Sequence, residues 1–145
     1  MNLENLYQQT ILEYSARKDV NYEMESPDFA ERGHNASCGD DITLLVKIND
    51  EDIVEDISFI GSGCAISTAS TAMLIDLVKG TTVQEAQEKI NTFFKMMKQE
   101  EVSEEELESI GDAGLLESTA HLPARIKCAT LSWHTLQVIF QKYQS

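Results

Sequence analysis

Two apolar, β-branched runs separated by a short polar turn constrain the fold of this chain more than any other feature. Residues 42–48 (ITLLVKI) and 53–60 (IVEDISFI) flank the polar sequence of residues 49–52 (NDED). Two such runs around a polar turn predict a β-hairpin. Periodic patterns elsewhere favour helices, so we expect an α+β fold: a small antiparallel sheet of two or three strands, covered on one face by helices.

The segments around the hairpin carry their own signals. Residues 1–18 have apolar side chains close to a 3.6-residue period, which predicts an amphipathic N-terminal helix. Residues 19–35 lack such periodicity and contain Ser26-Pro27 and Gly33, so we interpret them as an irregular segment with at most one short edge strand.

Four further helices are predicted after the hairpin. The first covers residues 65–79, and the second begins at the capping box of Thr82 and Glu85 and runs to about Lys98. A short helix capped by Ser103 lies in an acidic run, which is usually a solvated surface. The last helix is long and opens at Pro123, and we expect Gly111 and Gly114 to form a flexible joint before it.

The length and the cysteine content indicate how many domains the chain forms and in what redox environment it works. A chain of 145 residues forms one domain, residues 1–145, that can bury enough surface to fold without disulfide bonds. Three widely spaced cysteines, an odd number, favour free or metal-bound thiols in a reducing cytoplasm. No basic segment followed by an apolar one begins the chain, and no stretch reaches the ~18 apolar residues of a membrane span.

The charge balance limits the class of partner. The chain has 11 Lys and Arg against 25 Asp and Glu, a net charge of −14. This argues against nucleic-acid binding, which depends on cationic contacts with phosphates. A basic partner surface is one interpretation, and an acidic surface that keeps a small protein in solution is the other.

The three cysteines lie at places suited to chemistry. Cys38 is in a turn-rich loop before the hairpin, two residues from Asp40, with Gly39 between them. Cys64 follows a Gly-Ser-Gly bend at the start of a helix, and Cys128 lies in the first turns of the last helix. A lone cysteine is more often a small buried hydrophobe, but together these positions predict that folding brings all four side chains to one point.

Such a group would suit a metal ion. Three thiolates and one carboxylate fit tetrahedral zinc, and a metal deprotonates its thiols far more strongly than a helix dipole does. The carboxylate of Asp40 is a harder and more easily displaced ligand than a thiolate. This ligand set therefore indicates a site that exchanges ligands rather than one that only stabilises the fold.

Other candidate residues are less specific. Arg125 lies three residues before Cys128, where it can stabilise an anionic sulfur or a partner's carboxylate, or simply be solvated. We do not expect His34, His121 or His134 to bind the metal. The chain has no P-loop, no Gly-x-Ser-x-Gly elbow and no zinc-deaminase pattern.

Three motifs together resemble those of the IscU/NifU-like iron–sulfur cluster assembly proteins. They are residues 35–40 (NASCGD), 61–67 (GSGCAIS) and 122–129 (LPARIKCA). The resemblance covers the chain from Cys38 onward and is closest to the SufU branch. IscU scaffolds place a histidine where this chain has Lys127, and the segment of residues 93–121 is similar to the extra segment of SufU proteins.

The SufU resemblance implies a function. SufU-like proteins bind zinc, accept sulfur from a pyridoxal-phosphate-dependent cysteine desulfurase of the SufS type, and pass it to downstream iron–sulfur assembly proteins. By this resemblance Cys38 is the sulfur acceptor, and Asp40, Cys64 and Cys128 retain the zinc. A histidine of the partner would take the place of Cys38 on the metal, which frees that thiolate to attack the desulfurase persulfide.

Two alternatives stay open at this point. The protein can be an IscU-type scaffold that holds iron or a transient iron–sulfur cluster, although the missing histidine weakens this hypothesis. It can also be a non-catalytic binding domain with a structural zinc, in which case removing the metal would unfold it.

Overall fold

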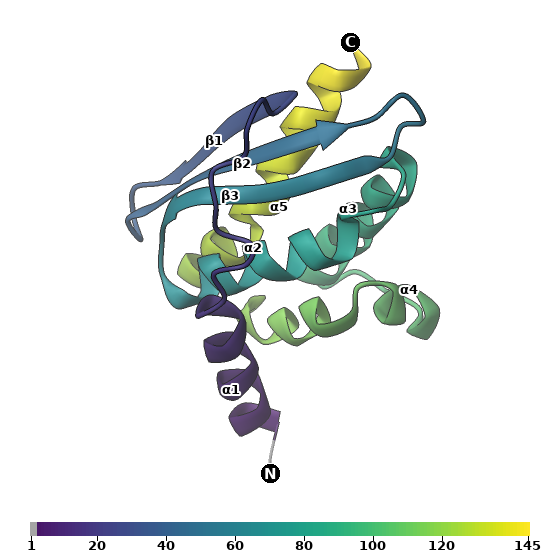
Figure 1. Cartoon of the computed structure of the whole chain (residues 1–145). Helices are drawn as coiled ribbons and strands as arrows, with labels where there is room; N and C mark the ends of the chain where they lie inside the picture. Colours follow the sequence, from purple (N-terminus) through teal and green to yellow (C-terminus); the bar gives the residue numbers. More distant parts are fainter. Residues whose placement is uncertain (1–2) are drawn as a thin grey trace.

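The predicted hairpin forms two of the three strands of an antiparallel sheet in a computed structural model that describes residues 3–145 (Figure 1). Strands β2 (Asp40–Ile48) and β3 (Val54–Ser62) are its two arms, with Asp41 opposite Ser62 at the end far from the turn. Strand β1 (Phe29–Asn35) pairs with the other edge of β2, which gives the order β1-β2-β3. The expected α+β class is confirmed.

Helices lie on one face of this sheet. Figure 1 shows α2 (Ala65–Val78) and α3 (Val83–Met97) below the strands and α5 (Pro123–Gln144) crossing behind them. Helix α1 (Leu3–Ser15) packs beside α2. Residues 16–28 cross from the free edge of β3 toward β1 over the opposite face of the sheet. The sheet thus has its helical layer on one side and a single chain segment on the other.

The predicted helix starts are confirmed. Thr82 and Glu85 form a capping box at the start of α3, and Ser103 and Glu106 form another at α4 (Glu104–Ser109). In each, the hydroxyl accepts a hydrogen bond from the third backbone N–H, so one otherwise unpaired donor of the helix end is satisfied. Pro123 occupies the first turn of α5, where its missing N–H costs nothing.

The edge strand β1 occupies the second half of residues 19–35, the segment that we expected to be irregular with at most one short edge strand. Its sequence, FAERGHN, has no β-branched residue, so strand propensity gave no signal for it. The strand forms because it can pair with β2 and pack against α5. It ends at Asn35, which places the loop containing Cys38 directly between β1 and β2.

The expected flexible joint at Gly111 and Gly114 is wrong. Residues Gly111–Thr119 form a 3₁₀ helix, η1, in which Ala113 and Leu116 are buried in the main core. Burial of these apolar side chains fixes the segment despite its two glycines, because the area removed from water outweighs the conformational freedom of the backbone.

The core joins the helical layer to the sheet around one large aromatic pair. The ring of Trp133 in α5 stacks on Phe93 in α3, with centroids 3.8 Å apart and planes 5° from parallel. Its indole N–H donates to the hydroxyl oxygen of Ser70 in α2 at 2.8 Å, and Ser70 donates in turn to the carbonyl of Ala129. These contacts fix the first turns of α5 against α2, and hence Cys128 relative to Cys64.

No helix within residues 3–145 is long and apolar enough to span a membrane.

Candidate functional site

The four residues singled out from the sequence meet at the end of the sheet where β2 begins and β3 ends. Cys38 lies in the turn between β1 and β2, and Asp40 is the first residue of β2. Cys64 is the N-cap of α2, directly after β3, and Cys128 lies in the second turn of α5. Residues far apart in the sequence are therefore brought together by the sheet register and by the packing of α5.

Three of the four side chains form a tight group. The ligand atoms of Cys38, Asp40 and Cys128 all lie within 4.8 Å of one another. The two sulfur atoms are 2.9 Å apart, well beyond the ~2.05 Å of a disulfide bond, and all three cysteines are free. Two soft sulfur ligands and one carboxylate oxygen at such separations can bind a single metal ion.

The surroundings of Asp40 are suited to a bound cation. The residue is 0 % exposed, and its Oδ1 accepts a hydrogen bond from the backbone N–H of Cys64 at 2.9 Å. Its Oδ2 is buried and has no hydrogen-bond partner among the described residues. A buried carboxylate oxygen without a partner is costly, and a bound metal ion would compensate it.

Gly63 makes room for this carboxylate. A Cβ atom added at Gly63 would lie 2.7 Å from Asp40 Oδ1 and 2.9 Å from Ser67 Oγ, closer than real Cβ atoms approach their neighbours. The bend before α2 therefore requires glycine at this position, because any side chain would push the carboxylate out of place.

Cys64 lies beside the tight group rather than within it. Its sulfur accepts the backbone N–H of Ser67 at 3.4 Å, so the thiol itself caps α2. Burial first, and then contacts with the thiols of Cys38 and Cys64, raise the pKa of Cys128 well above its usual range. Crowded, buried thiols of this kind ionise together only if a positive charge compensates them, which a metal ion supplies.

Cys38 is the thiol of the tight group that reaches the surface. It is partly exposed, whereas Cys128 is 4 % exposed. The following residue, Gly39, has a φ of +71°, the left-handed conformation that glycine adopts without steric cost. This turn lets Cys38 and Asp40 approach the same point from either side of one residue.

Two further residues touch the site and were not singled out from the sequence. The side-chain amide of Asn35 lies 3.9 Å from the sulfur of Cys128 and can donate a hydrogen bond to it, and Ser67 is buried beside Cys64. Both residues lie in the motifs of residues 35–40 and 61–67, but the motifs gave them no role, because their contacts depend on the pairing of β1 with β2 and on the start of α2.

The structure does not bring the remaining candidates to the thiols. Arg125 is exposed, and its side chain makes no hydrogen bond or ion pair within residues 3–145, so its role stays a prediction. His134 stacks on Phe94, with ring centroids 4.4 Å apart, and His34 is exposed on β1. None of the three histidines belongs to the group of possible metal ligands.

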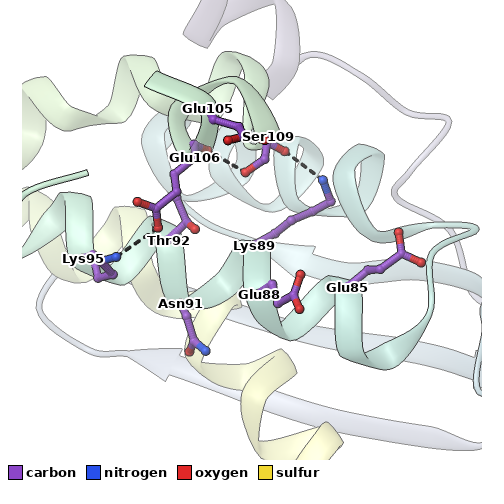
Figure 2. A pocket seen from close by; sticks show the side chains of 9 residues that line it. All are labelled: Glu85, Glu88, Lys89, Asn91, Thr92, Lys95, Glu105, Glu106 and Ser109. Atoms are coloured by element: carbon purple, nitrogen blue, oxygen red, sulfur yellow. Dashed lines mark hydrogen bonds and ion pairs between the residues drawn. The ribbon is translucent and has the colours of Figure 1, made fainter. Parts of the chain in front are cut away.

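A separate cavity of about 470 Å³ lies between α3 and α4, and both of its lysines already have partners (Figure 2). Lys95 forms an ion pair with Glu106 at 2.9 Å, and Lys89 donates to the carbonyl of Ser109 at 2.9 Å. These contacts tie α4 to α3. None of the cysteines lines this cavity, so the thiol site is the better candidate for function.

Together the fold and this site define a small α+β domain with a cysteine- and aspartate-lined centre suited to a metal ion. The chain belongs to the family of the NifU-like N-terminal domain, whose model matches residues 6–145.

Relatives with known names cover nearly the whole chain. It is 40 % identical over 136 residues to the iron–sulfur cluster assembly scaffold protein IscU of Streptococcus pyogenes serotype M1, with 93 % of this chain and 82 % of the relative covered. It is 38 % identical over 136 residues to the zinc-dependent sulfurtransferase SufU of Bacillus subtilis (strain 168), with 94 % and 90 % covered.

A solved structure shares the fold. The crystal structure of FiSufU from the thermophile Fervidobacterium islandicum AW-1 superimposes with a TM-score of 0.83 at 36 % identity, over 93 % of this chain and 96 % of that one. The resemblance to the IscU and SufU proteins noted from the three cysteine motifs is thereby confirmed.

Proposed function

We propose that this protein is a zinc-dependent sulfur acceptor that takes persulfide sulfur from a cysteine desulfurase for iron–sulfur cluster assembly. The observation that carries the proposal is that Cys38 is partly exposed on a turn while Asp40 and Cys128 lie buried behind it. Cys64 is also partly exposed, but its sulfur accepts the N–H of Ser67 and caps α2. The similarity to the B. subtilis protein named as a zinc-dependent sulfurtransferase supports the same choice.

Cys38, Asp40, Cys64 and Cys128 are the residues that would hold the zinc. Bound zinc would keep the thiols ionised at neutral pH and store the Cys38 thiolate until a partner docks. The unpartnered Oδ2 of Asp40 and the closeness of two sulfurs support this assignment. The N–H of Cys64 holds Asp40 in place, so the carboxylate remains while the surface thiol is released.

The chemistry of Cys38 is that of thiol exchange. Its thiolate attacks the outer sulfur of the desulfurase persulfide, so that a new S–S bond forms and the persulfide's own S–S bond breaks. The desulfurase cysteine leaves as a thiolate. Any proton on the outer sulfur stays on that sulfur when it moves to Cys38. The transfer needs no added oxidant or reductant, only an ionised and accessible attacking thiol.

Direct detection of the transferred sulfur tests this proposal. The zinc-loaded protein is incubated with a pyridoxal-phosphate-dependent cysteine desulfurase of the SufS type and cysteine, then digested without reductant. The peptide containing Cys38 is expected to gain the mass of one sulfur atom. If no peptide gains sulfur while the desulfurase turns over, the protein is not a sulfur acceptor.

A scaffold for a transient iron–sulfur cluster is the second candidate. Relatives named as IscU scaffold proteins favour it, in S. pyogenes and, at 34 % identity over 142 residues, in Thermotoga maritima. A scaffold would yield a coloured, oxygen-sensitive form on anaerobic reconstitution with iron and sulfide, and would transfer its cluster to an apoprotein. A colourless protein that accepts sulfur supports the first proposal instead.

Removing the metal is expected to lower the melting temperature but leave the protein folded. The core around Trp133 and Phe93 does not depend on the site. Without the metal, only the end of the sheet next to the starts of α2 and α5 would lose a link between its elements. Thermal unfolding followed by circular dichroism before and after chelation measures this. Complete loss of the helical signal at 25 °C would mean that the zinc is structural, as in a non-catalytic binding domain.

Substituting Gly63→Ala is expected to weaken zinc binding, by roughly 10–100-fold, because the new methyl group displaces the Asp40 carboxylate. Competition with a chromophoric chelator measures the affinity. Gly114→Ala is the matched control, since a Cβ at Gly114 would meet no atom within 4 Å. Equal zinc affinity in both variants would contradict the role given to Asp40.

A further inference from the structure

The three thiols differ in the hydrogen bonds that they accept from N–H groups. The sulfur of Cys64 accepts the backbone N–H of Ser67 at 3.4 Å. The sulfur of Cys128 lies 3.9 Å from the side-chain nitrogen of Asn35, which donates toward it. Within residues 3–145, no N–H group donates to the sulfur of Cys38.

Such hydrogen bonds change how a thiolate behaves. An N–H donor stabilises the negative charge on sulfur, which makes the sulfur a weaker nucleophile and holds it in one position. A metal-bound thiolate without a donor keeps its electron density available for attack. The pattern of donors therefore separates two retained sulfurs from one reactive sulfur.

Asn35 is well placed to act in this way. It is 9 % exposed, and it stands at the end of β1, paired directly with Asp40 on β2. Its backbone carbonyl also accepts the N–H of Cys38 at 3.3 Å, which closes the turn. One residue thus holds the loop of the reactive thiol with its backbone and contacts the buried thiol with its side chain.

We propose that Asn35 is a positioning residue that retains Cys128 as a permanent ligand and thereby directs incoming sulfur to Cys38. The inference deepens the proposed function and rests on it. It predicts that the choice of reacting thiol depends on the Asn35 amide as well as on the exposure of Cys38.

The test uses Asn35→Asp, which keeps the size of the side chain but replaces the donor by an acceptor, so access to Cys128 does not change. Asn35→Leu removes the donor without adding charge. Asn91→Asp, at an exposed position of α3, is the matched control. Each zinc-loaded protein is treated with limiting iodoacetamide, and the alkylated cysteines are identified by peptide mass mapping.

In the unmodified protein and in Asn91→Asp, the label is expected mainly on Cys38. Both Asn35 variants are expected to show an about tenfold rise in the labelling of Cys128 relative to Cys38, the effect of losing one hydrogen bond to a charged group. Cys64 stays as protected as before, because its donor is the backbone of Ser67. With Co²⁺ in place of zinc, the thiolate-to-cobalt absorption should shift in the Asn35 variants only.

Unchanged labelling of Cys128 in both Asn35 variants overturns the inference, as does an equal rise at all three cysteines, which would indicate general loosening. No desulfurase is present, so this result is independent of the sulfur-transfer test. A positive labelling result without sulfur transfer would retain the role of Asn35 and reject the proposed function.

Discussion

Substituting Cys38→Ala is expected to reduce stimulation of a SufS-type desulfurase to the level measured without this protein. Cys38 is the partly exposed thiol of the tight group, and Cys128 is buried in α5. Cys64 is also partly exposed, but its sulfur is engaged in capping α2. Loss of the attacking group removes the reaction path rather than slowing it by a modest factor. The measurement is the rate of alanine formation from cysteine by the desulfurase.

The matched control is Ser37→Ala, an exposed neighbour on the same loop. This variant should stimulate the desulfurase as the unmodified protein does. The Cys38→Ala variant should still bind zinc, more weakly, through Asp40, Cys64 and Cys128. Full stimulation by a zinc-loaded Cys38→Ala variant would contradict the proposal that this protein is a sulfur acceptor.

Substituting Trp133→Ala is expected to lower the free energy of unfolding by about 3–5 kcal/mol, a large share of the stability of a small domain. The indole is 0 % exposed, stacks on Phe93 and donates to Ser70, so its removal leaves a cavity at the junction of α2, α3 and α5. Urea unfolding followed by circular dichroism measures the loss, since the variant has no tryptophan left to report by fluorescence.

Val138→Ala provides the comparison for that experiment. Val138 lies on the same helix but is 37 % exposed, so its substitution should change the free energy of unfolding by less than about 0.5 kcal/mol. A loss below about 1 kcal/mol in Trp133→Ala would show that this aromatic pair is not the centre of the core.

Much of the fold could be predicted because its elements have local signals. Two β-branched runs predict the hairpin, and capping boxes predict the starts of α3 and α4. Strand β1 could not be predicted in the same way, because Glu31, Arg32 and His34 give it no apolar face and only pairing with β2 makes it a strand. Helix η1 was missed because its glycines obscured the buried Leu116.

The candidate site was predictable to the extent that its residues sit at recognisable breaks in the chain. Cys38 and Cys64 lie where a loop meets a strand or a helix, and Cys128 lies in the second turn of α5. Asn35 could not be singled out, because its contact with Cys128 arises only from the register that places Asn35 opposite Asp40. Contacts of this kind depend on tertiary structure, which local sequence patterns do not encode.

The proposed function depends on three sulfurs and one carboxylate oxygen binding a single zinc ion. Zinc K-edge X-ray absorption on the purified, untagged protein measures this shell directly. We expect one zinc per chain with three sulfur ligands at about 2.3 Å and one oxygen ligand at about 2.0 Å. A zinc shell made only of nitrogen and oxygen, or a protein that binds no stoichiometric zinc, would contradict it.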